Sequence, residues 1–154
     1  KNLDFYSQAI AKTNLLNSFY FIHVGRKGWG NLPSQLKHVQ VNNDQELANL
    51  ITNAQAVVIP SLYEGFGLPV VEAMHLGKPV FLSQFTSLPE VGGPDAYYFT
   101  DFDGASMREI LVNGLKDYQE HDKKQSIQEW SKRFDWSVAA ASYVDVYTRL
   151  AERK

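Results

Sequence analysis

The stretch that decides the fold is "VVIPSLYEGFGLPVVEAMHLGKPVFLS", residues 57–83. Its first and last segments are uninterrupted apolar runs, which are typical of parallel strands buried on both faces. Between them, Pro69 opens a helical pattern over residues 68–76 and Gly77 follows its end, which is the usual order of proline and glycine around a helix. The stretch therefore predicts a strand, a glycine-containing turn, a helix and a second parallel strand.

The same alternation continues on both sides of this stretch. Strands are predicted at residues 19–24, 38–41, 56–60, 79–83 and 96–100, and helices at residues 3–15, 44–51, 68–76, 103–115, 121–134 and 136–154. Asp44 and Asp103 are in position to cap two of these helices. Strand–helix–strand repeats with short connections indicate one α/β domain over residues 1–154, built on a parallel sheet.

The composition narrows the possible functions. Apolar residues form 44% of the chain, charged residues form 21%, and the formal net charge is −2. These are ordinary globular values, and without a basic excess neither nucleic acid nor an anionic membrane is an expected partner. No apolar run reaches the ~20 residues of a membrane span. Cysteine is absent, which suits a reducing compartment, so we expect a cytoplasmic protein.

The turn "EGFG" follows the carboxyl end of a predicted strand, where parallel sheets bind ligands. Gly65 and Gly67 allow positive φ and a close approach of a ligand to the backbone. The helix that follows directs unpaired N–H groups at the same point, which favours a phosphate. Glu64 and Glu72 stand on either side, and a carboxylate can hold the vicinal hydroxyls of a ribose or a pyranose. On this reasoning alone, a tight turn without a ligand and a solvated Glu72 remain open.

These residues resemble the signature of glycosyltransferase family 4, which are retaining, sugar-nucleotide-dependent enzymes of the GT-B architecture. The hallmark is a pair of glutamates around a Gly-Phe-Gly turn, then E-A-M and G-x-P-V. The chain carries all of these elements: Glu64, Gly65, Phe66, Gly67, Leu68, Pro69, Glu72, Ala73, Met74, Gly77, Pro79 and Val80. The resemblance continues in "FIHVGRKGWG", "SLPEVGGPDAYYFTDFD" and "RFDWSVAAASYVDVY". It implies a Rossmann-like, three-layer C-terminal lobe with helices on both faces of the sheet.

The resemblance also implies a role for each matching residue. Glu64 would orient the transferred sugar near the reacting carbon and act as the catalytic carboxylate, and Glu72 would accept hydrogen bonds from the ribose. Backbone N–H groups of the turn would hold the diphosphate together with Lys1, and the base would lie beside Gly25. The implied donor-binding residues are Lys1, Gly25, Glu64, Gly65, Phe66, Gly67, Leu68 and Glu72. Neither a metal nor another cofactor is expected.

The strand and the arginine that precede Lys1 in the family have no counterpart in this sequence, nor does the N-terminal acceptor-binding domain. We therefore expect the chain to be the donor-binding lobe of a longer parent, lacking its first strand and inactive alone. The expected partners are a nucleotide-sugar donor and, through the other lobe, a carbohydrate or glycolipid acceptor. Any peripheral membrane association would also come through the parent.

Other functions remain open at this point. A glycoside hydrolase would use Glu64 and Glu72 as an acid/base pair, about 5 to 9.5 Å apart across one bond, and a phosphate-binding turn between them would have no purpose. A non-catalytic nucleotide-binding or assembly module would keep the same turn. Related GT-B enzymes, such as sugar-nucleotide epimerases and phosphorylases, would keep it as well.

Some further features have competing interpretations. Glu72 and His75 have a spacing that is found in carboxylate-bridged metal sites, but the second copy of the motif is missing. Residues 101–106, "DFDGAS", begin like a calcium loop but lack the remaining ligands, so a helix cap explains them better.

Aromatic and basic residues outside the turn also allow more than one interpretation. His23 either packs at the end of its strand or lines the nucleotide site, and Lys27 and Trp29 follow in a loop nearby. We interpret the aromatic face of the 136–154 helix as core. In the resembling family this region packs toward the second lobe, so its apolar stripe could instead be exposed.

Overall fold

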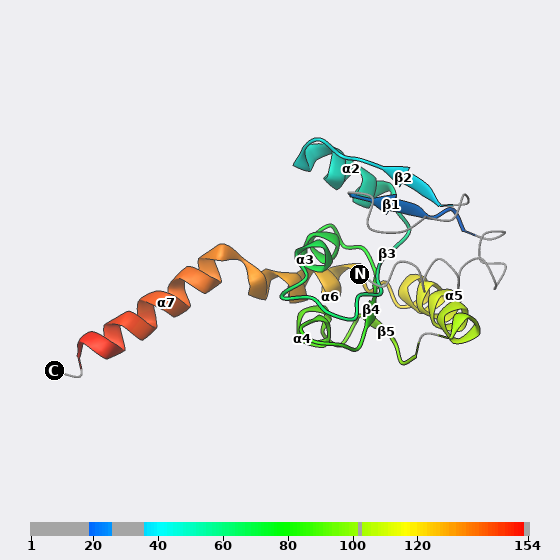
Figure 1. Cartoon of the computed structure of the whole chain (residues 1–154). Coiled ribbons are helices and arrows are strands. Elements are labelled where there is room, and N and C mark those ends of the chain that lie inside the picture. Colours follow the sequence, from blue (N-terminus) through cyan, green and yellow to red (C-terminus); the bar gives the residue numbers. More distant parts are fainter. Residues whose placement is uncertain (1–18, 26–35, 102, 153–154) are drawn as a thin grey trace.

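The computed structural model describes residues 19–25, 36–101 and 103–152, which form an α/β body and one extended helix (Figure 1). Its strands are β1 (Ile22–Val24), β2 (Lys37–Val39), β3 (Val57–Ile59), β4 (Val80–Ser83) and β5 (Tyr97–Phe99). Its helices are α2 (Asp44–Asn53), α3 (Leu68–His75), α4 (Leu88–Gly92), α5 (Gly104–Glu120), α6 (Lys124–Ser131), the 3₁₀ helix η2 (Lys132–Phe134) and α7 (Trp136–Ala151). The helix expected at residues 3–15 lies outside the described residues.

The strands pair in parallel, as predicted. His23 of β1 lies opposite His38 of β2, and β4 pairs with β3 on one side and with β5 on the other. Within the described ranges the strands form two separate ladders, β1–β2 and β3–β4–β5. The strand limits differ from the predicted ones: β1 begins three residues later, and β2 covers residues 37–39 rather than 38–41. Strands β3 and β5 are one residue shorter at each end, and β4 begins one residue later.

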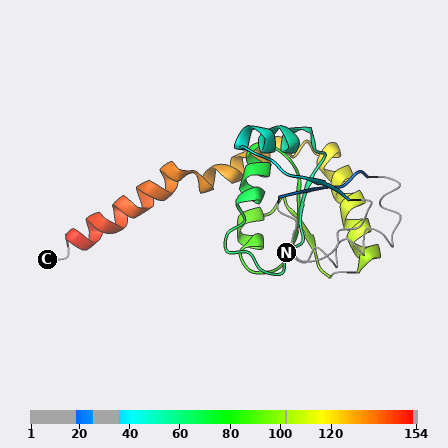
Figure 2. The same cartoon turned by 45° about the horizontal axis from the view of Figure 1, so that its top comes forward.

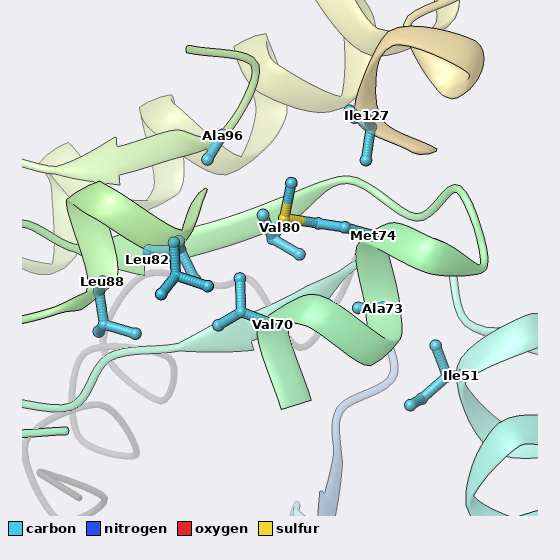
Figure 3. Close-up of a cluster of buried hydrophobic side chains, with 10 residues drawn as sticks. Ile51, Val70, Ala73, Met74, Val80, Leu82, Leu88, Ala96 and Ile127 are labelled. Atoms are coloured by element: carbon cyan, nitrogen blue, oxygen red, sulfur yellow. The ribbon is translucent and has the colours of Figure 1, made fainter. Parts of the chain in front are cut away.

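Strand β4 supplies side chains to both faces of its ladder, because successive side chains of a strand point in opposite directions. Val80 and Leu82 pack in one cluster with residues from the helices on that side: Val70, Ala73, Met74, Leu88, Val91 and Ile127 (Figure 3). Phe81 packs on the opposite face in a second cluster: Phe99, Met107 and Leu111. The sheet therefore lies between two layers of helices, which confirms the predicted three-layer α/β fold.

Helix α3 begins and ends where the sequence predicts. Gly67 at its N-cap has a φ of 103°, Pro69 stands in the first turn, and Gly77 just past its end has a φ of 71°. The Gly77 N–H bonds the Met74 carbonyl and so satisfies one of the last free carbonyls of the helix. Residues that favour helix boundaries therefore define both the beginning and the end of α3.

Helix α4 was not predicted. It has only five residues, and Pro89 stands in its first turn. Leu88 and Val91 are buried in the cluster of Figure 3 and hold this short turn against β4. A helix of this length has too few residues to show a helical period, so its stability comes from packing.

The cap of α2 differs from the prediction. Asn43, rather than Asp44, is the N-cap residue, and its side-chain oxygen accepts a 2.9 Å hydrogen bond from the Glu46 N–H. Asn43 has an extended backbone, φ −155°, which lets its side chain reach back over the first turn. Asp44 is already helical and contributes only a negative charge near the positive end of the helix dipole.

Asp103 caps α5 as predicted, which also accounts for the residues that resemble a calcium loop. Its carboxylate accepts hydrogen bonds from the N–H groups of Ala105 and Ser106, at 2.9 and 3.1 Å.

We expect Asp103→Ala to lower the free energy of unfolding by about 1 kcal/mol, because two N–H groups lose their acceptor. Urea unfolding followed by circular dichroism measures this. Asp103→Asn keeps an acceptor oxygen and should retain most of the stability; an equal loss in both variants would contradict the capping role.

Helix α7 extends away from the α/β body in both views (Figures 1 and 2), and none of its residues is buried. Trp136 is 88% exposed, and Tyr143 and Tyr147 are each 65% exposed. The interpretation of this aromatic face as core is therefore wrong. A helical period identifies an apolar stripe, but it does not say what covers the stripe.

Among the described helices, none is long and apolar enough to cross a membrane.

Candidate functional site

The candidate site lies at the carboxyl ends of two neighbouring strands. Strands β3 and β4 pair in parallel, with Ile59 opposite Leu82, so the segments that leave them begin at the same edge of the sheet. Residues 60–67, here called the glutamate loop, connect β3 to α3. Residues 84–87, the hydroxyl loop, connect β4 to α4. This edge is where parallel α/β sheets bind ligands.

Glu64 is half-buried and its carboxylate is held from one side. The Ser61 hydroxyl, on a residue only 2% exposed, donates a 2.7 Å hydrogen bond to Glu64 Oε1. The Ser61 carbonyl in turn accepts a short hydrogen bond from the Ser83 hydroxyl at the end of β4. Glu64 Oε2 has no hydrogen bond to any residue that the structure describes, and it is thus the oxygen that remains for a ligand.

The glycine turn presents consecutive backbone N–H groups. Those of Phe66, Gly67 and Leu68 donate to no other described residue, and they stand at the N-terminus of α3, where the helix dipole is positive. Pro69 follows and has no N–H group. Three free donors in succession at a helix start are suited to an anion.

The two glycines of the turn serve different purposes. Gly67 has the left-handed φ that was expected of both. Gly65 does not, so that part of the prediction was wrong. A Cβ atom at Gly65 would meet none of the described residues within 4 Å, so these leave open space beside its backbone. Gly65 therefore leaves room at the edge of the site rather than supplying a special backbone angle.

Glu72 stands on the exposed side of α3, while Val70, Ala73 and Met74 are fully buried. Partial burial raises the pKa of its carboxyl group, and the neighbouring Asp44 carboxylate adds to the rise. The residue as a whole remains exposed, so the desolvation is partial. The Glu72 carboxylate has no hydrogen-bond donor among the described residues, and it can accept a bond from a ligand hydroxyl.

Gly25 directly follows β1, in the other ladder. It has a φ of 114°, its N–H bonds the Val39 carbonyl, and its carbonyl accepts a 2.6 Å hydrogen bond from His38 Nε2. His23 stacks on His38, with ring centroids 5.4 Å apart, which favours the packing interpretation of His23. A Cβ at Gly25 would meet none of the described residues within 4 Å, and the placement of the base beside Gly25 stays a prediction.

The remaining candidate residues divide into two groups. Lys1, Lys27 and Trp29 lie outside the described residues. Glu72 and His75 lie within them, but in the described ranges no group of three potential metal ligands comes together. The structure thus brings Glu64, the glycine turn and Glu72 together on one loop and helix.

Sequence reasoning missed the residues that hold the glutamate loop: Ser61, Ser83, Thr86 and Ser87. A signal was available, because "SQFTS" places three hydroxyl residues at the end of the strand next to the glutamate loop. Small hydroxyl side chains are common in loops for many reasons, so their spacing alone does not indicate which backbone groups they bind.

Comparison with known proteins points to a glycosyltransferase family. A family model described as "Glycosyl transferases group 1" matches residues 30–126. The MMP alpha-(1->4)-mannosyltransferase of Mycolicibacterium hassiacum is 37% identical over 120 residues, covering 72% of this chain and 28% of that protein. The serotype-specific mannosyltransferase WbdA of Escherichia coli is 35% identical over 129 residues, covering 82% of this chain and 16% of that protein. The chain thus spans less than a third of either relative.

Solved structures share the fold. Sucrose-phosphate synthase from Thermosynechococcus elongatus aligns with all of this chain and 43% of its own, with a TM-score of 0.72 and 20% identity. The catalytic domain of starch synthase IV from Arabidopsis thaliana aligns with 77% of this chain and 27% of its own, with a TM-score of 0.59 and 18% identity. These likenesses show the fold, and the family model and the curated relatives show that the chain belongs to the glycosyl transferases group 1 family.

Proposed function

We propose that this chain is the donor-binding lobe of a retaining glycosyltransferase, which moves a sugar from a nucleotide-diphosphate-sugar to an acceptor hydroxyl. The observation that carries the proposal is the run of three free N–H groups at the start of α3, with one available carboxylate before it and one after it. A diphosphate fits the N–H groups, and a sugar and a ribose fit the two carboxylates.

Each part of the donor then has a partner in the chain. The diphosphate accepts hydrogen bonds from Phe66, Gly67 and Leu68, and Lys1 is proposed as its cationic partner. Glu64 Oε2 accepts from hydroxyls of the transferred sugar, since Oε1 is already bound to Ser61. Glu72 accepts from the ribose hydroxyls, and the base lies in the open space beside Gly25.

The chemistry needs charge stabilisation more than a nucleophile. As the bond between the anomeric carbon and the phosphate oxygen breaks, negative charge grows on the diphosphate and positive character grows on the sugar. Fixed N–H donors at a helix N-terminus stabilise that charge, and they need no rearrangement during the reaction. The acceptor oxygen bonds to the anomeric carbon on the face that the phosphate leaves, and the departing phosphate oxygen takes the proton of the acceptor hydroxyl, which gives retention. Under this proposal no metal ion is required.

We further propose that the acceptor binds to another lobe and that this chain alone transfers no sugar. Several curated relatives are named mannosyltransferases, so mannosyl donors are the first to test. The test is calorimetric titration of the complete gene product with UDP-, GDP- and ADP-sugars, with and without a chelator. We expect one nucleotide class to bind well and the chelator to have no effect. Release of sugar from an oligosaccharide without any nucleotide would overturn the proposal.

We expect Glu72→Ala to weaken donor binding about tenfold, because the carboxylate loses hydrogen bonds to the ribose hydroxyls. The fold should not lose stability, since the Glu72 carboxylate has no donor among the described residues. Titration calorimetry and thermal unfolding measure the two quantities. Glu120→Ala, at an exposed site on α5, is the matched control and should leave donor affinity unchanged. Unchanged affinity in Glu72→Ala would contradict the ribose assignment.

The pH dependence of the same variant has a definite sign. Because the pKa of Glu72 is raised in the folded state, the folded protein favours the protonated carboxyl more than the unfolded chain does. The stability contribution of Glu72 is therefore present at low pH and is lost as the pH rises through its folded-state pKa. Relative to the wild type, Glu72→Ala should be more stable at neutral pH, and this advantage should shrink on acidification. An advantage that grows on acidification would contradict the raised pKa.

A further inference from the structure

The hydroxyl loop reaches back and binds the backbone of the glutamate loop at three atoms. Thr86 Oγ1 accepts a 3.1 Å hydrogen bond from the Glu64 N–H. The Ser87 hydroxyl lies 3.0 Å from the Glu64 carbonyl oxygen and 3.1 Å from the Phe66 carbonyl oxygen, and it shares its one proton between them. The hydroxyl loop, which leads into α4, therefore binds the peptide groups on both sides of the Glu64 Cα.

Thr86 keeps an unfavourable backbone conformation while it makes this bond. Its φ is 54°, in the left-handed region, which a β-branched residue rarely adopts. Thr86 is exposed, so burial of its side chain does not compensate for the strain. Such strain persists where the surrounding structure fixes it, and it is concentrated at functional sites. In this chain the strained residue directs its hydroxyl at the residue that presents the sugar-binding carboxylate.

The bonds of the hydroxyl loop complete a frame around Glu64. Its carboxylate is held through Ser61, which is itself held by Ser83 at the end of β4. Its N–H and carbonyl are held through Thr86 and Ser87. The frame thus fixes Glu64 Oε1 and both adjoining peptide groups. Because the carboxylate is planar, fixing Oε1 also restricts the direction in which Oε2 points.

We propose that Thr86 and Ser87 are positioning residues, which set the direction of the Glu64 carboxylate toward the transferred sugar. This inference rests on the proposed function, because it concerns the same site. Neither hydroxyl touches the donor under the proposal. Each acts through the backbone of the glutamate loop. Thr86 binds only the Glu64 N–H, so it should affect the rate of sugar transfer more than the binding of the nucleotide, which is held mainly by the turn and by Glu72. Ser87 also binds the Phe66 carbonyl in the turn, so it should affect both.

The experiment measures kcat, donor KM and melting temperature for variants of the complete gene product. Thr86→Ala should lower kcat about tenfold while donor KM changes less than twofold, since a positioning loss acts on the reacting end of the donor. Ser87→Ala should also lower kcat about tenfold, and it should raise donor KM as well, because the Phe66 carbonyl that Ser87 binds shares a peptide group with the Gly67 N–H. Thr86→Ser keeps the hydroxyl and should restore most of kcat. Thr86→Gly relieves the left-handed strain, so its melting temperature should be no lower than that of the wild type. Its kcat should still be low, because the hydroxyl is absent.

The chain offers a matched control for the backbone effect. Asp122 is the other non-glycine residue with positive φ among the described residues, at 42°, and it stands between α5 and α6, outside the glutamate and hydroxyl loops. Asp122→Gly also relaxes a left-handed backbone, at a residue type that tolerates this region better than threonine does, and it should leave kcat unchanged. A fall of kcat in Asp122→Gly equal to that in Thr86→Gly would overturn the inference, because backbone relaxation alone would then explain the loss.

Glu64→Gln and Glu72→Ala, measured in parallel, separate this inference from the proposed function. If neither of them changes kcat or donor affinity, the proposed function fails. If they have their expected effects but Thr86→Ala and Ser87→Ala retain full kcat, only the positioning inference is overturned. It is also overturned if Thr86→Ser is as slow as Thr86→Ala, because the hydroxyl then has no part in the loss.

Discussion

Glu64→Ala is expected to lower kcat for sugar transfer on the order of 100-fold, while the donor KM changes little. Hydrogen bonds from sugar hydroxyls to the carboxylate strengthen as the sugar gains oxocarbenium character, so their loss falls mainly on the transition state. The contacts of the diphosphate with the turn and of the ribose with Glu72 remain. Initial-rate kinetics of the complete gene product, with donor and acceptor varied in turn, separate the two parameters.

A second variant guards this result against a structural effect. Alanine at position 64 would leave the buried Ser61 hydroxyl without its acceptor, which alone could cost about 1 to 3 kcal/mol of stability. Glu64→Gln keeps a side-chain oxygen for Ser61 but removes the charge, so it should fold normally and still lose most of the turnover. Full activity of Glu64→Gln would contradict the assigned role.

Gly67→Ala is expected to lower both the stability of the fold and the affinity for the donor. The φ of 103° disfavours any residue with a Cβ, and the added carbon would lie 3.2 Å from Leu88 Cδ2. We expect a loss of about 1 to 2 kcal/mol in the free energy of unfolding. Relaxation of the turn would also move the N–H groups of Phe66 and Leu68, which should weaken donor binding on the order of tenfold.

Two other glycines provide the controls for this prediction. Gly77→Ala places a Cβ at a φ of 71° at the opposite end of α3, so it should lose stability but keep donor affinity. The Cβ added in Gly65→Ala meets none of the described residues within 4 Å, and position 65 has no left-handed φ, so the variant should keep the stability of the fold. It should lose donor affinity only if the donor lies against the backbone at this position. Thermal unfolding and titration calorimetry distinguish the three. An equal loss of affinity in Gly67→Ala and Gly77→Ala would contradict the role of the turn.

Much of the fold could be predicted because its signals are local. Gly67, Pro69 and Gly77 define the ends of α3 through their own backbone preferences, and Asp103 caps α5 with a side chain two and three residues from its partners. The apolar runs that became β3 and β4 are half-buried and fully buried, respectively, and uninterrupted apolar runs of this kind are typical of parallel strands. The position of the site followed from these elements, because it lies where a predicted strand meets a predicted turn.

The rest could not be predicted because it depends on contacts between distant segments. Helix α4 exists through the burial of Leu88 and Val91, and the exposure of α7 depends on what does not pack against it. Thr86 binds a residue 22 positions earlier, and Ser87 binds residues 23 and 21 positions earlier. A propensity scale would not place a threonine at positive φ, so this part of the site opposes its local signal.

The order of contacts along the glutamate loop and α3 has a consequence for the end of the reaction cycle. Glu64 stands before the three free N–H groups and Glu72 stands after them, so under the proposed function only Glu64 loses its partner when the sugar leaves. The departing nucleoside diphosphate keeps the turn and the ribose carboxylate, and it carries more charge than the intact donor did. The nucleoside diphosphate product therefore competes well with the donor for the same site. Under the proposed function its dissociation, rather than bond cleavage, becomes the rate-limiting step of turnover.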